Sequence, residues 1–172
     1  MGVGQTLRMI MKKTFFIFLM SFLSISLAQA QKISTEIFST DGSKQLLGQL
    51  YFTETPYGLL ISPKLTGLPP GLHGLHLHQH PDCSGHGMDA GDHFDPKNTN
   101  SHQGPYGQGH LGDLPVLYVD QNGKANTPIL APRLRLNDLK SLAIMIHAGG
   151  DSYSDTPKLG GGGDRIGCGV LP

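Results

Sequence analysis

The histidines of the segment Gly71–His80, which reads GLHGLHLHQH, are the first residues whose spacing suggests chemistry. Four of the nine histidines in the chain fall in this segment. In an extended strand, residues two apart project from the same face, so His76 and His78 point together. Leu75 and Leu77 then point to the opposite, apolar face. Two imidazoles side by side on a rigid strand can coordinate one metal ion.

Further residues of metal-binding type follow along the chain. One polar segment contains His93, His102, His110 and Asp113, and the apolar run AIMIH ends at His147. Composition alone allows a single zinc site with spare histidines. The spacing favours two sets, because imidazoles without a carboxylate suit copper, whereas a set with a hard oxygen ligand suits zinc. His93 lies between the two sets in the sequence.

Short strands must position these residues. Helix signals are nearly absent after residue 30, and Gly and Pro interrupt short apolar alternations every few residues. Gln121-Asn122-Gly123 is a strong hairpin signal. This rhythm predicts an all-β sandwich or barrel. The predicted strands are Lys32–Phe38, Gln45–Thr53, Gly58–Lys64, Gly74–His80, Pro115–Val119, Ala125–Leu136, Ala143–His147 and Arg165–Val170.

Two segments break the rhythm of strands and turns. Pro81–Asp113 is long, polar and rich in Gly, and Gly149–Asp164 contains four consecutive glycines, Gly160–Gly163. A compact domain rarely keeps a structureless loop of this length unless the loop is functional or is held by something other than the core. We call these segments the metal loop and the glycine-rich loop.

The N-terminus reads as a secretory signal peptide. Lys12 and Lys13 precede an apolar run, Phe15–Leu27, and Ala28-Gln29-Ala30 is a small-x-small cleavage site, so we expect cleavage before Gln31 and a periplasmic product. Residues 1–10 precede a complete signal that begins at Met11. The apolar run is shorter than the roughly 20 residues of a membrane span. Residues 31–172 then form one domain.

The remaining chain carries a modest negative charge. The leader holds three of the 13 basic residues and no acidic residue, which leaves 10 basic and 13 acidic residues and a net charge near −3. This balance favours neither nucleic acid nor an anionic membrane as a partner. Cys83 and Cys168 both lie in the exported part, where an even number of cysteines favours a disulfide.

Several motifs together resemble the bacterial, exported copper/zinc superoxide dismutases. They are GLHGLHLHQHPDCS, AGDHFDP, GPYGQGHLGDLP, LAPRL, IMIHAGGDSYSD and LGGGGDRIGCGV, and they run from about residue 71 to the end of the chain. The resemblance implies a Greek-key β-barrel or sandwich of about eight antiparallel strands with two long functional loops. It also implies one copper ion and one zinc ion per chain.

The resemblance assigns roles to particular residues of the matching motifs. It implies copper binding by His76, His78, His93 and His147, zinc binding by His93, His102, His110 and Asp113, and a bridging imidazolate at His93. Asp151 would hydrogen-bond ligands of both metals. Arg165 would sit above the copper and bind the anionic substrate, and Cys83 and Cys168 would form the disulfide.

Other residues receive weaker expectations. The family pattern gives no ligand role to His73, His80 and His86, so we expect surface or loop histidines there. Lys97 and Lys158, both from loops, are candidates for attracting an anion toward Arg165.

The activity implied is the conversion of superoxide to dioxygen and hydrogen peroxide, with copper alternating between two oxidation states, in protection of the cell envelope. Arg165 and His93 are the predicted catalytic residues. One alternative is an inactive copper- and zinc-binding protein on the same fold, which would need neither an anion-docking Arg nor a bridging imidazole. A zinc hydrolase is another, but it would need an open zinc position. The sequence leaves both a monomer and a homodimer open.

Overall fold

The structure, a computed structural model, describes residues 31–172. The predicted leader, residues 1–30, lies outside the described residues. No helix within residues 31–172 is both long and apolar enough to cross a membrane. The strands are β1 (Lys32–Ser39), β2 (Leu46–Thr55), β3 (Gly58–Thr66), β4 (Gly71–His73), β5 (Leu75–His78), β6 (Leu117–Val119), β7 (Lys124–Ala125), β8 (Ile129–Ala131), β9 (Ala143–His147) and β10 (Arg165–Val170).

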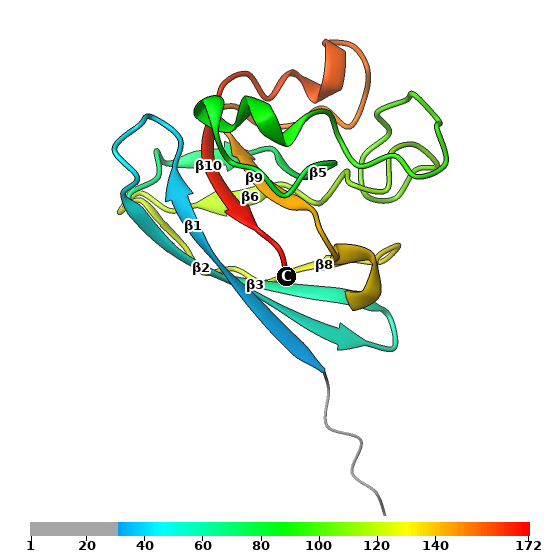
Figure 1. Cartoon of the computed structure of the whole chain (residues 1–172), viewed down its shortest axis with the longest axis horizontal. Helices are drawn as coiled ribbons and strands as arrows, with labels where there is room; N and C mark the ends of the chain where they lie inside the picture. Colours follow the sequence, from blue (N-terminus) through cyan, green and yellow to red (C-terminus); the bar gives the residue numbers. More distant parts are fainter. Residues whose placement is uncertain (1–30) are drawn as a thin grey trace, which may run out of the picture.

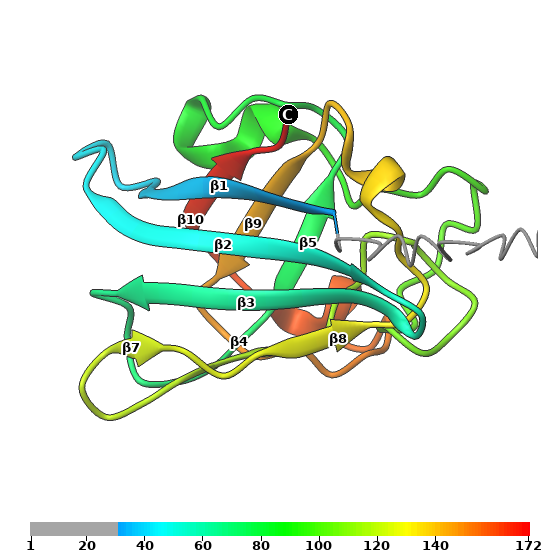
Figure 2. The same cartoon turned by 90° about the horizontal axis from the view of Figure 1, so that it is seen from below.

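The strands form one curled antiparallel sheet and a separate two-stranded ribbon (Figures 1 and 2). The large sheet has the order β5-β9-β10-β1-β2-β3-β7, with β8 also paired to β3, and the ribbon pairs β4 with β6. Because β10 returns beside β1 of the β1-β2-β3 meander, the arrangement is of the Greek-key type. The predicted all-β class is therefore confirmed. Three short 3-10 segments complete the described chain: Gly85–Ala90, Leu136–Leu139 and Lys158–Gly161.

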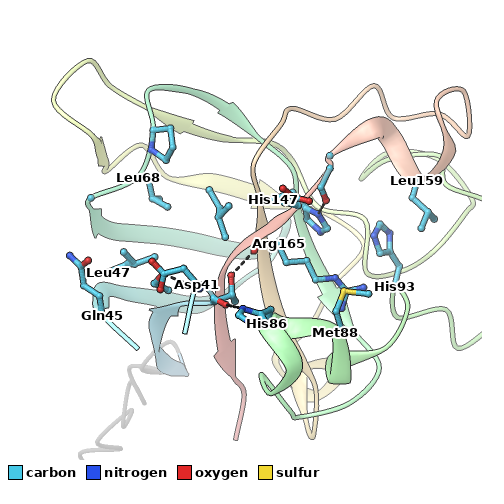
Figure 3. Close-up of a pocket in the computed structure, with 18 of the residues that line it drawn as sticks. Asp41, Gln45, Leu47, Leu68, His86, Met88, His93, His147, Leu159 and Arg165 are labelled. Atoms are coloured by element: carbon cyan, nitrogen blue, oxygen red, sulfur yellow. Dashed lines mark hydrogen bonds between the residues drawn. The ribbon is translucent and has the colours of Figure 1, made fainter. Parts of the chain in front are cut away.

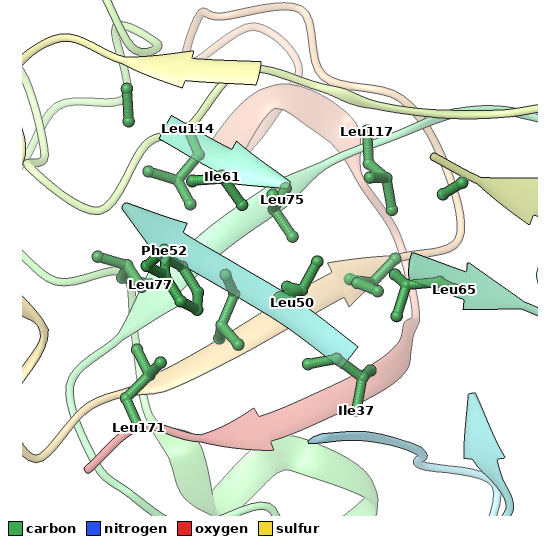
Figure 4. Close-up of a cluster of buried hydrophobic side chains, with 14 of the residues drawn as sticks. Ile37, Leu50, Phe52, Ile61, Leu65, Leu75, Leu77, Leu114, Leu117 and Leu171 are labelled. Carbon is green, nitrogen blue, oxygen red and sulfur yellow. The ribbon is translucent and has the colours of Figure 1, made fainter. Parts of the chain in front are cut away.

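The core lies on the inner face of the curled sheet (Figure 4). Alternate residues of β2 and β3, such as Leu50, Phe52 and Ile61, are fully buried, as strand geometry requires. Each such side chain contributes about 1.5–3 kcal/mol of transfer free energy. From β5, Leu75 and Leu77 join this core, as the sequence predicts. Their burial fixes the register of β5, and with it the direction of His76 and His78.

Both faces of β9 are buried, and this explains its unbroken apolar run. Ile144 and Ile146 pack into the main core, while Ala143 and Met145 pack with Cys168 in a small second cluster. Adjacent strands then carry the histidines to one place. In the pairing of β5 with β9, His76 lies opposite Met145, and in the pairing of β9 with β10, His147 lies opposite Arg165.

Two of the predicted strands differ from the structure in an informative way. The predicted strand Gly74–His80 is shorter in the structure, where β5 covers Leu75–His78, and the preceding residues Gly71–His73 form β4, which the sequence does not predict. At Gly74 the chain leaves the β4–β6 ribbon for the large sheet. Gly74 makes backbone hydrogen bonds to Gly149 and His147, and a Cβ atom there would lie 3.1 Å from the His76 ring. The segment Ala125–Leu136 divides into β7 and β8, because Pro128 and Pro132 cannot donate to a ladder.

The predicted Gln121-Asn122-Gly123 turn is present, although it joins strands of different sheets. Gly123 N donates to Asp120 O at 3.0 Å, and Asp120 N donates to Lys124 O at 2.8 Å. Beyond this closing bond, β6 pairs with β4 while β7 pairs with β3. The turn chemistry was local and predictable, but the partner strands depend on tertiary packing.

Both long irregular loops lie where the sequence places them. The metal loop falls between β5 and β6, and the glycine-rich loop falls between β9 and β10. The predicted disulfide joins Cys83 of the metal loop to Cys168 of β10. Isolated bridges pair His76 with Asp113 and His78 with His93, so the metal loop folds back along β5.

Candidate metal centre

The first histidine cluster stands on the ends of two adjacent strands. His76 and His78 of β5, His147 of β9 and His93 of the metal loop offer ring nitrogens that all lie within 4.8 Å of one another. All four side chains are buried. The structure thus brings together the residues for which the motifs imply copper binding.

The second cluster belongs almost entirely to the metal loop. His93, His102, His110 and Asp113 also offer atoms within 4.8 Å of one another. The Oδ1 atom of Asp113 lies 3.0 Å from Nδ1 of His93, 2.9 Å from Nδ1 of His102 and 3.3 Å from Nδ1 of His110. One carboxylate oxygen and three imidazole nitrogens therefore face a common point.

His93 is the one residue that the two clusters share. Its ring centroid lies 4.0 Å from that of His76 and 5.0 Å from that of His78. On its other side the centroids of His102 and His110 lie 5.4 Å and 5.5 Å away. Because Nδ1 of His93 faces Asp113, its Nε2 is left for the first cluster.

Five ring nitrogens in these clusters are buried without a hydrogen-bond partner among the described residues. They are Nδ1 of His76, Nε2 of His78, Nδ1 of His102, Nδ1 of His110 and Nε2 of His147. The nitrogens of His102 and His110 lie within ion-pair distance of Asp113 Oδ1, but they make no hydrogen bond of acceptable geometry. Buried polar atoms without partners are rare and costly in proteins. Their convergence is what two metal ions would satisfy, so the residues present fit copper in the first cluster and zinc in the second.

Four of these histidines have their other ring nitrogen held by a protein oxygen. Nε2 of His76 lies 2.7 Å from Asp151 Oδ2, and Nε2 of His102 lies 2.8 Å from Asp151 Oδ1. Nδ1 of His78 lies 2.8 Å from Gly91 O, and Nδ1 of His147 lies 3.2 Å from Gly163 O. Such partners orient the rings and select the tautomer that leaves the free nitrogen pointing inward.

Asp151 links the two clusters, because one oxygen serves each. The link needs a glycine beside it. Gly160 has a positive φ of 74°, and a Cβ atom there would lie 2.1 Å from Asp151 Oδ1. The glycine-rich loop can therefore pack against this carboxylate only with a residue that lacks a side chain.

Burial keeps the first cluster neutral. It lowers the pKa of His76 to about 3, that of His78 to about 2 and that of His147 to about 4. Neutral imidazole is the form that binds metal. Burial acts in the same direction on the pKa of His93.

The second cluster holds opposite charges. Burial opposes a charge on His102, yet the carboxylates of Asp113 and Asp151 outweigh it and raise the pKa of His102 to about 9. Burial would likewise raise the pKa of Asp113, but the three neighbouring histidines hold it well below its usual range. The same balance, with His102 and His76 as partners, lowers the pKa of Asp151.

Arg165 lies in a cavity of about 820 Å³ that His93 and His147 also line (Figure 3). Its guanidinium donates hydrogen bonds to Gly87 O and Gly91 O, and the latter bond is 2.8 Å long. Gly91 O also faces Nδ1 of His78, so one carbonyl positions both the arginine and a histidine of the first cluster.

The structure distinguishes the two lysines that the sequence offers as candidates for attracting an anion toward Arg165. Lys158 lines this cavity, whereas Lys97 is exposed on the metal loop and is not one of the lining residues. Asp41 and Asp164 line the cavity as well, so its charge is mixed. Hydrogen bonds from Ser43 and Ser39 lower the pKa of Asp41 to about 2 and keep it ionised.

The expectation that His73 is a surface or loop residue is wrong. Only 2% of its surface is exposed, with Nδ1 lying 2.7 Å from His147 O and Nε2 lying 2.7 Å from Pro69 O. Its position three residues before His76 carries no signal for the His147 carbonyl, which is 74 residues away in the sequence. His80 and His86 are exposed, as expected.

No role for Arg133 of the LAPRL motif is predicted from the sequence. In the structure this side chain donates four hydrogen bonds to the metal loop. The motif identified the residue, but nothing in its spacing shows what it contacts.

Fold and site together define an all-β protein with two adjoining clusters suited to metal ions and a shared imidazole. The family model for copper/zinc superoxide dismutase matches residues 46–171. A copper–zinc superoxide dismutase of Legionella pneumophila is 58% identical over 161 residues, covering 94% of this chain and 99% of the relative.

Two solved structures are also similar. A copper/zinc superoxide dismutase from Brucella abortus has a TM-score of 0.78 and 38% identity, covering 83% of this chain and all of that one. A monomeric enzyme from Salmonella enterica has a TM-score of 0.72 and 45% identity, with the same coverage.

The chain belongs to the copper/zinc superoxide dismutase family. The predicted activity, an oxidoreductase that converts superoxide to dioxygen and hydrogen peroxide, and the predicted cofactors, copper and zinc, are thereby confirmed. The alternatives of an inactive metal-binding protein and a zinc hydrolase are not favoured.

Proposed function

We propose that the two clusters are the copper and zinc sites of this enzyme. His76, His78, His93 and His147 bind copper, and His93, His102, His110 and Asp113 bind zinc. The observation that carries this assignment is the set of five buried ring nitrogens without partners, which point into the two clusters on either side of His93. Copper, when bound, supplies the one-electron chemistry, and zinc has no redox chemistry of its own.

Arg165 is the residue that docks the substrate. Superoxide is a small anion, and a guanidinium in the cavity wall beside His93 and His147 offers it both charge and hydrogen-bond donors. The bonds to Gly87 O and Gly91 O hold the guanidinium in place before the substrate arrives. This preorganisation reduces the cost of orienting the anion.

His93 is the proposed proton carrier of the reaction. Its Nδ1 is held on the side of Asp113, and its Nε2 faces the first cluster beside the cavity that Arg165 lines. Nε2 is also the atom that would bind copper, so it can hold a proton only while it is not bound to the metal. A proton held there would be placed for delivery to the peroxide formed when superoxide is reduced. Asp151 keeps the rings of His76 and His102 fixed, which limits rearrangement between turnovers.

We also propose where the enzyme works. Residues 1–30 direct export and are removed before Gln31, so residues 31–172 act in the periplasm and protect the cell envelope. The disulfide between Cys83 and Cys168 suits an oxidising compartment. Mass spectrometry of the exported protein tests this: a chain that begins at Gln31 supports the proposal, and a retained leader contradicts it.

The assembly belongs to the same proposal. The sequence leaves a homodimer open, and the similar Salmonella enterica enzyme is described as monomeric. Sedimentation equilibrium of the mature protein across a range of concentrations distinguishes a monomer from a homodimer.

Metal analysis and a superoxide-consumption assay test the ligand assignment. We expect one copper and one zinc per chain, with loss of copper and activity in His147→Ala. Arg165→Ala should retain both metals and lose roughly tenfold in rate, because the anion loses its docking charge. His80→Ala is the control, since His80 is exposed and outside both clusters. Full copper content in His147→Ala would overturn the assignment.

A further inference from the structure

Among residues 31–172, Arg133 makes more side-chain hydrogen bonds to the metal loop than any other residue outside that loop. It lies two residues beyond the end of β8. Its Nε donates to Pro105 O at 3.0 Å, Nη1 donates to Gly109 O at 3.0 Å, and Nη2 donates to Gly104 O at 3.0 Å and to His110 O at 2.5 Å. One guanidinium thus binds four carbonyl oxygens within seven residues of chain.

These carbonyls belong to the part of the metal loop that separates two proposed zinc ligands. The chain from 104 to 110 runs between His102 and His110 and forms neither helix nor strand. A backbone bond from His110 N to Ser101 O, 2.9 Å long, closes its base, and Arg133 donates to four of its carbonyl oxygens. The spacing of His102 and His110 is therefore set by contacts to a side chain more than 20 residues away.

The guanidinium has no carboxylate partner within ion-pair distance in the described part of the chain. Its charge is met by carbonyl dipoles and, at longer range, by the charge of Asp113, which opposes the lowering of the Arg133 pKa by burial. A planar fork with several fixed donors can satisfy four carbonyls at once, whereas the compact ammonium of lysine cannot.

We infer that Arg133 is a positioning residue for the zinc site, and that it acts by holding the loop between His102 and His110 in the conformation that binds the metal. The inference rests on the zinc ligands proposed above. His76, His78 and His147 stand on β5 and β9 and make no hydrogen bond to Arg133. Its loss should therefore weaken zinc binding while leaving copper binding nearly unchanged.

The test is a competition titration of the metal-free mature protein with zinc, and separately with copper, against chelators of known affinity. We expect Arg133→Lys and Arg133→Gln each to lose about 10–100-fold in zinc affinity, the range typical for groups that orient metal ligands. Copper affinity should change by less than about threefold. Arg133→Lys keeps the charge and loses the fork, so it separates electrostatics from positioning.

Arg135→Gln is the matched control. Arg135 is half-exposed, lies two residues further along the chain and pairs with Glu54 at 3.5 Å, away from the metal loop. Its replacement should change neither affinity. Circular dichroism of each metal-free variant verifies the fold, and the visible spectrum of cobalt placed in the zinc site should change in the Arg133 variants alone.

Three outcomes would overturn the inference. They are unchanged zinc affinity in Arg133→Lys, equal losses of zinc and copper affinity, and a loss of equal size in Arg135→Gln. His110→Ala tests the underlying assignment separately. If His110→Ala retains zinc, the proposed ligand set fails, whereas if it loses zinc and both Arg133 variants retain it, only the role of Arg133 fails.

Discussion

In four histidines of this site, the two ring nitrogens have different surroundings. In His76, His78, His102 and His147, one ring nitrogen is held by a protein oxygen and the other is buried without a hydrogen bond. Residue type alone says that a histidine can bind a metal. The fixed nitrogen says which atom does so, because it selects the tautomer and the direction of the ring.

Zinc and copper binding should differ in their dependence on pH. In the metal-free protein His102 is charged below pH 9, because Asp113 and Asp151 raise its pKa to about 9. Burial instead lowers the pKa of His76 to about 3 and the pKa of His147 to about 4, so these rings are neutral. Zinc must therefore displace a proton near pH 7, and copper need not. Zinc affinity should rise about tenfold per pH unit between pH 6 and 8, with copper affinity nearly flat.

Calorimetry in buffers of different ionisation enthalpy measures this proton directly. We expect about one proton released on zinc binding and close to none on copper binding. Zinc binding without proton release would contradict the charge assigned to His102.

At the scale of elements, rigid strands carry the first cluster and a loop carries the second. β5 and β9 place His76, His78 and His147 through strand register, which buried leucines and isoleucines hold. The metal loop has only isolated bridges to β5, at His93 and Asp113, and no continuous ladder. The conformation of the metal loop depends on the disulfide near its start and on the hydrogen bonds of Arg133 to the segment between His102 and His110. It also depends on Asp151 of the glycine-rich loop, which holds the ring of His102.

Removal of the disulfide should destabilise the protein. Cys83 and Cys168 are 85 residues apart, and closing a loop of that length is worth about 4 kcal/mol in the chain-entropy model. Cys83→Ser combined with Cys168→Ser should lower the free energy of unfolding by up to this amount in denaturant titrations. Reduced wild-type protein is the control and should match the variant. An unchanged unfolding midpoint in both would show that the metal loop does not need this bond.

At the scale of the whole molecule, net charge and local charge oppose each other. Residues 31–172 carry 10 basic and 13 acidic residues, so the protein as a whole does not attract superoxide. Attraction must come from the cavity, where Arg165 and Lys158 stand against Asp41 and Asp164.

The rate of superoxide consumption should therefore fall as salt is added, because ions screen exposed charges over about 10 Å at 0.1 M. Lys158→Gln should lower the rate at low salt, by less than about tenfold, and flatten the salt dependence. Lys97→Gln is the control, since Lys97 is also an exposed lysine but does not line the cavity. Equal effects of the two substitutions would exclude a local role for Lys158.

Much of this protein was decided by short-range sequence pattern. The alternation of residue types in β5 predicts Leu75 and Leu77 in the core, with His76 and His78 on the opposite face. The apolar run AIMIH predicts a buried strand that ends at His147. These predictions succeed because successive side chains in a strand point to opposite faces, so residues two apart share a face. The motif string was specific enough to identify the family and the metal-binding residue types.

The tertiary structure alone decided how distant segments meet. The exchange of sheets at Gly74, the burial of His73 between Pro69 and His147, and the four bonds of Arg133 all join residues whose separation in sequence carries no periodic signal. Even the place of His93 between the clusters required the metal loop to fold back along β5. Such contacts follow from packing of the whole chain, because each satisfies a buried polar group whose partner no local pattern can specify.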